Sequence, residues 1–408
     1  MRVLIAGAGV AGTAMGIAAR KAGLDPIIFE AYPESAGLDH GVYLTVAING
    51  IDALAAIDAD HVVRDHGFET NHITFSSGSG RRLGRLQLGP AMRDGTVTHT
   101  VRRTDLYRVL HEEAANRGVE TWHGKKLVGA EEVDGRVEVR FEDGSTASGD
   151  LLVGADGVGS PTRRIIDPAN PAPRYAGLGN TGGFTRIPGL EARPGDYEMV
   201  WGKRCFFGYT VAPDGEVWWF ANPPARREPT AARLAGLESS QIKKALADLV
   251  ADDRSPAAQI IASDRGVLRV TNQYDLPHVP TWRRGRMVII GDAAHAVSPS
   301  SGQGCSLAVE DAVTLARCLR DLPDPEHALG VYESLRRNRV ERIVDWGASM
   351  NNTKRRGSVA WALREFVLPQ IFKKASGPAR LEEMSWMYRH HIDWDTPVGD
   401  ESRRKEMR

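Results

Sequence analysis

Three glycines near the start of the chain have the spacing of a phosphate-binding turn. Gly7, Gly9 and Gly12 follow a short apolar segment, residues 2–6, and precede an alanine-rich stretch that reaches Ala22. In such a turn the first glycine permits the tight bend, and the second lets a pyrophosphate approach the backbone. The third allows a helix to pack closely on a strand, and the start of that helix offers free N–H groups to the phosphates. This spacing predicts a nucleotide site.

An acidic residue completes the same unit. Residues 26–30 have the composition of a second strand and end on Glu30, whose carboxylate could accept hydrogen bonds from a ribose. Gly23 stands where the intervening helix would end. Strand, glycines, helix, strand and acid follow one another within about thirty residues, as in a dinucleotide-binding βαβ unit. The alternative is a βαβ unit that packs tightly and binds nothing.

Two later segments also place an acid close to the end of a buried strand. Residues 151–154 are apolar and precede Asp156, and Ser160-Pro161 then has the composition of a helix start. Residues 287–290 are apolar and precede Asp292 and a glycine-rich loop. Backbone N–H groups of such a loop can stabilise a developing negative charge.

Three titratable residues follow Asp292 in the sequence. His295 could act as a general base, but we favour a role in holding the loop. Glu310 and Asp311 lie within the predicted helix after the loop, and we expect them to form structural hydrogen bonds or salt bridges.

The composition argues against several classes of protein. The 408 residues carry 52 Lys and Arg against 52 Asp and Glu, whereas nucleic-acid binding needs a basic face. Three cysteines without a CxxC pair argue against a disulfide scaffold or a zinc site, and fit the cytoplasm. The uncharged stretch from Val3 to Ala19 resembles a signal peptide, but glycines interrupt it and we assign it to the βαβ unit. No other segment is long and apolar enough to cross a bilayer.

The order of the segments predicts an α/β fold in which one domain is interrupted twice by another. The chain from 175 to 273 is strand-like and aromatic, whereas helical periodicity prevails from about 326. We therefore expect a Rossmann-like nucleotide-binding domain, a β-sheet substrate domain and a C-terminal helical region. The nucleotide-binding domain would comprise residues 1–68, 101–175 and 274–335. The substrate domain would comprise 69–100 and 176–273, and the helical region 336–408.

An aromatic hairpin is predicted in the substrate domain. Residues 212–216 (Ala-Pro-Asp-Gly-Glu) have the composition of a three-residue loop, a type I turn followed by a left-handed glycine. That register places six residues on one face, which we call the front face: Phe206, Gly208, Thr210, Trp218, Phe220 and Asn222. The other face, the back face, carries Cys205, Phe207, Tyr209, Val217 and Trp219. A two-residue turn would shift the pairing by one and regroup these partners.

We predict that the front face lines the substrate cavity. Gly208 would leave room between large rings, and Asn222 would supply a polar contact. The predicted substrate residues are Phe206, Trp218, Phe220 and Asn222. The alternative is that these aromatic side chains merely fill the core between the two domains.

Together the three glycine-containing motifs resemble a known family. GxGxxG, GADGxxS and GDAAHxxxPxxGQG, in this order within residues 1–335, resemble those of the single-component FAD-dependent aromatic hydroxylases, or group A flavoprotein monooxygenases. These have the p-hydroxybenzoate hydroxylase fold and include salicylate hydroxylases, zeaxanthin-epoxidase-like proteins and tetracycline-inactivating monooxygenases. The W-x-W-x-I-P signature of the related flavin-dependent halogenases is missing.

The resemblance implies a set of FAD contacts. Arg103 matches the family's FAD-contacting arginine, with the adjacent Arg102 as a rival, and Asp292 would bond the ribityl chain. Asp156 belongs to a motif associated with both FAD and the nicotinamide cofactor, and Leu127 would offer its backbone to the adenine. The pyrophosphate and ribose contacts would come from Gly7, Gly9, Val10, Ala11, Gly12, Glu30 and Ala31. The contacts from the last motif are Pro299, Gly302, Gln303, Gly304 and Cys305, the final four near the flavin N1–C2=O edge. Ser306 stands where the family often has Asn.

The resemblance also implies a reaction that the cofactor largely performs. NADH or NADPH reduces FAD, O₂ adds to form a flavin C4a-hydroperoxide, and its distal oxygen is transferred to an electron-rich carbon. We expect hydroxylation or epoxidation of an aromatic, polycyclic or heteroaromatic compound by a monomer or homodimer, and we assign no catalytic side chain. The alternative is a flavin-bearing protein that binds or sequesters an aromatic compound without hydroxylating it.

Overall fold

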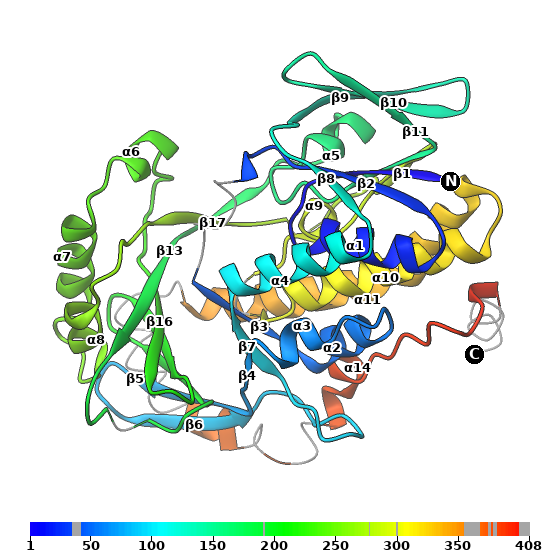
Figure 1. Cartoon of the computed structure of the whole chain (residues 1–408). Coiled ribbons are helices and arrows are strands. Elements are labelled where there is room, and N and C mark those ends of the chain that lie inside the picture. Colours follow the sequence, from blue (N-terminus) through cyan, green and yellow to red (C-terminus); the bar gives the residue numbers. More distant parts are fainter. Residues whose placement is uncertain are drawn as a thin grey trace.

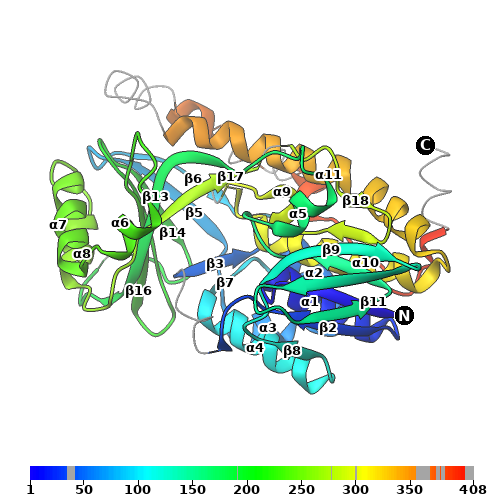
Figure 2. The same cartoon turned by 90° about the horizontal axis from the view of Figure 1, so that it is seen from above.

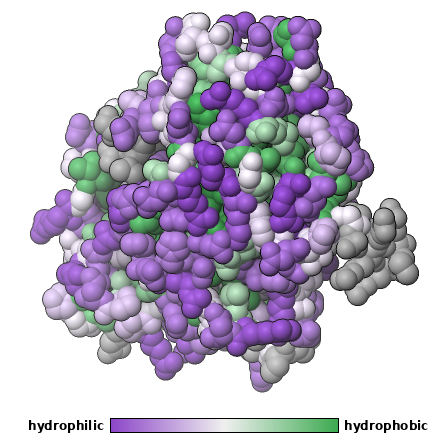
Figure 3. Space-filling model, turned by 45° about the vertical axis from the view of Figure 1, so that its right-hand side comes forward, coloured by the Kyte–Doolittle hydropathy of each residue, from purple (hydrophilic) through white to green (hydrophobic). Residues whose placement is uncertain are grey.

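A computed structural model describes most of the chain. It covers residues 1–34, 42–190, 192–276, 278–298, 301–354, 368–373, 377 and 382–399. Two sheets of different character lie side by side, one with six strands and one with seven (Figure 1). Among the described residues, no helix combines the length and the apolar character needed to span a membrane. Hydrophilic side chains predominate on the face in Figure 3, where hydrophobic ones form small separate groups.

The six-stranded sheet has the order β18-β19-β12-β1-β2-β8. Strands β1, β2, β8, β12 and β19 run parallel, which confirms the predicted βαβ unit at the start of the chain. The strands are β1 (Arg2–Ala6), β2 (Asp25–Phe29), β8 (Glu120–Trp122), β12 (Leu151–Gly154), β18 (Arg283–Arg284) and β19 (Met287–Ile289). The helices connected to them are α1 (Val10–Lys21), α4 (Arg103–Asn116), α5 (Pro161–Ile166), α9 (Asp292–His295) and α10 (Gly304–Asp321). A large apolar core joins this sheet to α1 and α10.

Two further sheets have three strands each. In the first, β10 (Arg136–Phe141) pairs with β9 (Leu127–Val133) and β11 (Thr146–Gly149), and Asp134 and Gly135 both have positive φ in the turn between β9 and β10. In the second, β7 (His99–Arg102) pairs with β3 (Tyr43–Val46) and β4 (Phe68–Glu69). Helices α2 (Ile48–Ala55) and α3 (His61–Arg64) lie between β3 and β4 in the sequence.

The seven-stranded sheet combines strands from two distant parts of the chain. Its order is β17-β13-β16-β15-β14-β5-β6. The strands are β5 (His72–Ser77), β6 (Arg82–Gln87), β13 (Arg174–Arg186), β14 (Tyr197–Trp201), β15 (Phe206–Val211), β16 (Glu216–Asn222) and β17 (Thr271–Asp275). Because β14 pairs with β5, the segment before residue 100 joins the segment after residue 173 in one sheet.

The expectation that the chain is strand-like from 175 to 273 is wrong for its second half. Residues 231–263 contain three helices, α6 (Ala231–Ala235), α7 (Ser239–Val250) and α8 (Ala257–Ser263). In α7 the buried residues Ile242, Leu246 and Val250 recur every four positions, and Glu238 forms a capping box with Gln241. Helices α7 and α8 cover the outer side of the seven-stranded sheet (Figures 1 and 2).

The C-terminal part of the chain contacts both sheets. Helix α11 (Pro325–Lys354) continues without a break through the predicted boundary at residues 335 and 336, and extends towards the seven-stranded sheet (Figure 2). Further on, Phe372 stacks on Phe75 of β5, with ring centroids 4.8 Å apart. Helix α14 (Ser385–Tyr388) lies near α2.

Candidate functional site

The glycine turn after β1 leaves open space at one position only. Gly7 has φ +99°, and a Cβ there would lie 2.5 Å from Ala155 O. A Cβ on Gly12 would overlap Gly7 O, so these two glycines are needed for packing. At Gly9 the nearest atom to an added Cβ would be Tyr107 Oη, 3.9 Å away. Gly9 also caps α1 without a side-chain acceptor, so the first N–H groups of the helix are available to a phosphate.

Glu30 is fixed next to this turn. One of its carboxylate oxygens accepts a hydrogen bond from Ala8 N at 2.8 Å, and the other accepts from Tyr32 N at 3.0 Å. Each oxygen retains a second lone pair, so the carboxylate can still accept from a hydroxyl group. Ala31, the next predicted contact, is exposed.

Three predicted residues from distant segments converge beside the glycine turn. Arg103, Asp292 and Cys305 lie close enough to perturb one another electrostatically. Burial lowers the pKa of Arg103, but Tyr107, Asp292 and Cys305 outweigh it, and the pKa is raised. Arg103 also donates a hydrogen bond of 2.8 Å to Tyr107 Oη. Because Tyr107 borders Gly9, these residues connect the glycine turn to the start of α10.

The carboxylate of Asp292 is free to accept a ligand. Its side chain is accessible to solvent, and no described residue donates a hydrogen bond to it. Surrounding protein atoms still partly desolvate the group, and this burial raises the pKa of Asp292 although His295 and Arg103 oppose it. Burial also raises the pKa of the Cys305 thiol to about 12, so this group stays protonated.

The two adjacent arginines serve different parts of the molecule. Arg102 forms an ion pair with Glu216 of β16, and its guanidinium lies 4.3 Å from the ring centroid of Phe184 and 5.2 Å from that of Trp218. Arg103 instead faces Asp292 and Cys305. This arrangement supports Arg103 over Arg102 as the predicted cofactor contact.

Asp156 fixes the start of α5. Its carboxylate accepts hydrogen bonds from Ser160 Oγ, from Thr162 N at 2.9 Å and from Thr162 Oγ1 at 2.6 Å. Burial outweighs these bonds and raises the pKa of Asp156. The buried Arg163 donates to Ala293 O at 2.9 Å, which ties α5 to α9, the short helix that begins with Asp292. The side chain of Asp156 therefore has protein partners, and its contact with a cofactor stays a prediction.

The start of α10 offers further backbone donors. Gly302 has φ +61°, and no side chain caps the helix at Gln303. The first hydrogen bond at this end of the helix runs from Leu307 N to Gln303 O. Gly304, Cys305 and Ser306 come before Leu307, so their N–H groups have no acceptor within the helix. Their N–H groups and the positive end of the helix dipole suit an electron-rich ring edge.

The remaining predicted cofactor residues differ in their surroundings. Ser306 Oγ accepts from Ala47 N at 3.1 Å, so the serine at the family's usual Asn position holds the start of α2. Leu127 begins β9, with its side chain in the core. Pro299 lies outside the described residues.

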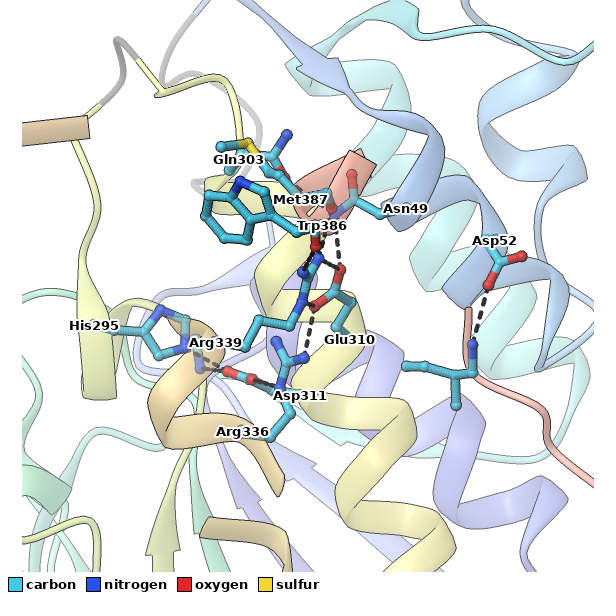
Figure 4. Close-up of polar contacts among 12 residues, drawn as sticks. Asn49, Asp52, His295, Gln303, Glu310, Asp311, Arg336, Arg339, Trp386 and Met387 are labelled. Atoms are coloured by element: carbon cyan, nitrogen blue, oxygen red, sulfur yellow. Dashed lines mark hydrogen bonds and ion pairs between the residues drawn. The ribbon is translucent and has the colours of Figure 1, made fainter. Parts of the chain in front are cut away.

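A network of buried ion pairs holds the segment from Gly291 to His295 in place (Figure 4). Asp311 accepts from Gly291 N at 2.9 Å and from Arg336 Nε at 2.7 Å, and it is paired with His295 Nε2. His295 is only 3% exposed. Asp311 thus orients the imidazole within the protein, which agrees with the structural role that we favour for His295.

Glu310 extends the network to two other helices, α11 and α2. It accepts hydrogen bonds from Arg336 at 2.6 Å, from both Nε and Nη2 of Arg339, and from Asn49 of α2 at 2.7 Å. The same Asn49 amide donates to Gln303 at the start of α10. Burial opposes ionisation, but Arg336 and Arg339 hold the pKa of Glu310 below its usual range. The structural role predicted for Glu310 and Asp311 is confirmed.

The aromatic hairpin has the predicted register. Phe206 pairs with Asn222, Gly208 with Phe220 and Thr210 with Trp218, and Gly215 has φ +83° in the three-residue loop. The back face packs against α7 and α8. On the front face, the ring centroid of Trp218 lies 5.7 Å from that of Tyr43.

One reason for choosing the front face is wrong. A Cβ on Gly208 would lie 2.5 Å from Phe220 Cε1 and 2.7 Å from Met199 Sδ, so these side chains already fill the room above the glycine. The Asn222 amide donates to Asn180 Oδ1 at 3.1 Å, and Phe206 belongs to a small core with Phe75, Trp201 and Phe372. Trp218 and Phe220 instead border Tyr43 of β3. All four substrate contacts stay predictions.

Comparison with known proteins decides the family. A family model described as FAD binding domain matches residues 1–347. The chain belongs to this family. The flavoprotein is 32% identical over 352 residues to aurachin C monooxygenase/isomerase of Stigmatella aurantiaca, which covers 85% of this chain and 87% of that protein. It is 30% identical over 352 residues to a FAD-dependent urate hydroxylase of Klebsiella pneumoniae, over 84% and 88% of the two chains.

A solved structure gives the same result for the fold. The structure of Klebsiella pneumoniae HpxO with FAD and uric acid superposes with a TM-score of 0.82 at 26% identity, covering 94% of this flavoprotein and 95% of HpxO. The predicted resemblance, the α/β fold and the classification as a flavoprotein monooxygenase are thus confirmed.

The side chains of the flavoprotein fit FAD. Gly9 leaves room for a pyrophosphate, and the starts of α1 and α10 carry uncapped N–H groups. Asp292 and Glu30 can accept bonds from hydroxyl groups of the ribityl chain and the ribose.

Sequence reasoning missed three residues near this site. Tyr107 and His111 follow Arg103 at helical spacing, and His111 Nε2 lies 2.7 Å from Ala8 O in the glycine turn. Their spacing of four residues was a usable signal. Tyr43 had no such signal, because its place depends on the pairing of β3 with the distant β7.

Proposed function

We propose that this flavoprotein uses NADH or NADPH and O₂ to insert one oxygen atom into an aromatic compound, either polycyclic or heteroaromatic. The observation that carries this proposal is the position of β3 and β7 between the two predicted sites. Arg103, next to the end of β7, faces Asp292 and Cys305, whereas Arg102 and Tyr43 face Trp218 of the front face. Cofactor and substrate would thus meet at these strands.

The overall reaction is balanced by its co-substrates. One atom of O₂ bonds to a ring carbon, and the other leaves as water with the two electrons from the nicotinamide and two protons. Bound FAD supplies the chemistry that passes these electrons to O₂.

The residues of the chain would bind and orient. Glu30 and Asp292 would hold hydroxyl groups of FAD, and the N–H groups at the start of α10 would stabilise negative charge at the N1–C2=O edge. The rings of Trp218, Phe220 and Tyr43 would exclude water and support an aromatic substrate through ring contacts.

The charges near the front face favour a neutral ring system. Arg102 is the cation that lies over Trp218, and Glu216 already neutralises it. A substrate carboxylate would have to displace Glu216 from a pair that is partly shielded from solvent. The names of the relatives support ring substrates of several kinds, including aurachin C, urate and 3-amino-4-hydroxybenzoate.

The test is substrate-stimulated oxidation of NADPH or NADH by the FAD-loaded protein, measured across a panel of polycyclic and heteroaromatic compounds. We expect at least one compound to accelerate oxidation and to yield a product heavier by one oxygen atom. Binding of such compounds without acceleration would contradict the proposal and favour the sequestering alternative.

A further inference from the structure

The hydroxyl group of Tyr43 lacks a hydrogen-bond partner. Its oxygen is buried, and no described residue bonds to it. Buried hydroxyl groups are normally paired, because an unpaired one loses its bonds to water without replacement. An unpaired buried hydroxyl next to a predicted substrate site therefore needs an explanation.

The Tyr43 ring lies where β3 meets the front face. Its centroid is 5.7 Å from that of Trp218, 6.2 Å from that of Phe220 and 6.0 Å from that of Tyr197. On the other side, Arg103 N donates to Val42 O at 3.1 Å, directly before Tyr43. Tyr43 thus directly follows the residue whose carbonyl group accepts a hydrogen bond from the backbone of Arg103, the arginine of the predicted flavin site.

The neighbouring hydroxyl groups are already used. Tyr197 Oη is hydrogen-bonded to Thr45 Oγ1 at 2.9 Å and accepts from Thr100 Oγ1 at 3.0 Å. Thr100 Oγ1 is also hydrogen-bonded to Thr70 Oγ1 at 2.7 Å. Tyr197 therefore satisfies its hydroxyl within the protein, whereas Tyr43, which stacks on it, does not.

The Tyr43 hydroxyl keeps its proton, so it can form a hydrogen bond with a neutral partner. Burial, and to a lesser extent Tyr197, raise the pKa of Tyr43 well above its ordinary value. The group therefore remains an O–H that can both donate and accept one hydrogen bond.

We propose that Tyr43 Oη bonds a polar ring substituent of the substrate, a hydroxyl, a carbonyl or a ring nitrogen, while Trp218 and Phe220 contact the ring itself. This inference rests on the proposed function and deepens it. It makes Tyr43 a specificity-determining residue, because the bond fixes which edge of the ring system faces the flavin. Ring compounds without a polar substituent would leave the hydroxyl unpaired and bind more weakly.

The test compares Tyr43→Phe with the matched variant Tyr197→Phe. Both keep an aromatic ring, but only Tyr197→Phe removes a hydroxyl that has protein partners. We expect the Tm of Tyr43→Phe to equal or exceed that of the wild type, and the Tm of Tyr197→Phe to fall. FAD affinity should be the same in Tyr43→Phe and the wild type.

Ligand binding is then measured on the FAD-loaded proteins with 2-naphthol and naphthalene, from the change in flavin absorbance. The wild type should prefer 2-naphthol, and Tyr43→Phe should weaken 2-naphthol binding by about 10-fold with little change for naphthalene. Equal 2-naphthol affinities in the two proteins, no 2-naphthol binding by the wild type, or a loss of FAD affinity in Tyr43→Phe would each overturn the inference. A wild type that oxygenates no ring compound would instead refute the proposed function.

Discussion

Replacing Glu310 by Gln should destabilise the protein more than any surface substitution of the same kind. Glu310 is fully buried and accepts bonds from Arg336, Arg339 and Asn49. Gln cannot neutralise the arginines, and its NH₂ group would face their donors. Breaking a buried ion pair from one side costs about 3–5 kcal/mol. With about 2.1 cal/mol/K of unfolding entropy per residue, this corresponds to a loss of about 4–6 °C in Tm for a chain that unfolds as one unit.

The matched control is Glu333→Gln on α11, the helix that carries the arginine partners of Glu310. Glu333 pairs with Arg337 at 2.6 Å and with Arg283 at 3.0 Å, but its side chain is 22% exposed. Partly exposed pairs of this kind contribute about 0–1 kcal/mol, so the Tm should fall by about 1 °C or less. Thermal unfolding followed by circular dichroism measures both variants. An equal or higher Tm for Glu310→Gln than for Glu333→Gln would contradict the inference that the buried network of Glu310 and Asp311 stabilises the protein.

Three further predictions concern the flavin site and the ionic network. Gly9→Ala should keep the wild-type Tm but lose FAD affinity, because an added Cβ has room in the protein and none beside a pyrophosphate; Gly12→Ala should fail to fold stably, since its Cβ would overlap Gly7 O. Asp292→Ala should release FAD more readily, as measured by flavin fluorescence after dilution, and unchanged occupancy would count against this assignment. The pKa values of Glu310 and Asp311 are lowered in the folded state, so the stability they add is present above pH about 4.5 and is lost as the pH falls further. The Tm of the wild type should therefore fall more steeply below pH 4.5 than that of Glu310→Gln.

Local sequence signals predicted several elements of both sheets well. The glycine turn, the N-cap at Ser160 and the hairpin register all depend on residues within a few positions of one another. For the hairpin, the composition of residues 212–216 was enough to predict a three-residue loop. That loop fixes the register of the two strands as far as the pair of Phe206 and Asn222.

Features that depend on distant contacts were not predictable in the same way. The room above Gly208 is taken by Met199, which reaches it only because β14 pairs with β15. Tyr43 meets Trp218 through the pairing of β3 with β7, far apart in the sequence. The helices at 231–263 were not predicted for a different reason. The strand-like, aromatic composition up to Phe220 was extended to the residues that follow it, where such aromatic side chains are absent.

The most direct test of the account is a titration of the FAD-free protein with FAD, followed by the absorbance and fluorescence of the flavin. We predict saturable uptake of one FAD per chain by the wild type, and weakened uptake by Gly9→Ala and Asp292→Ala at unchanged Tm. Folded wild-type protein that remains colourless with excess FAD would contradict the assignment of the glycine turn, Asp292 and the start of α10 to one cofactor.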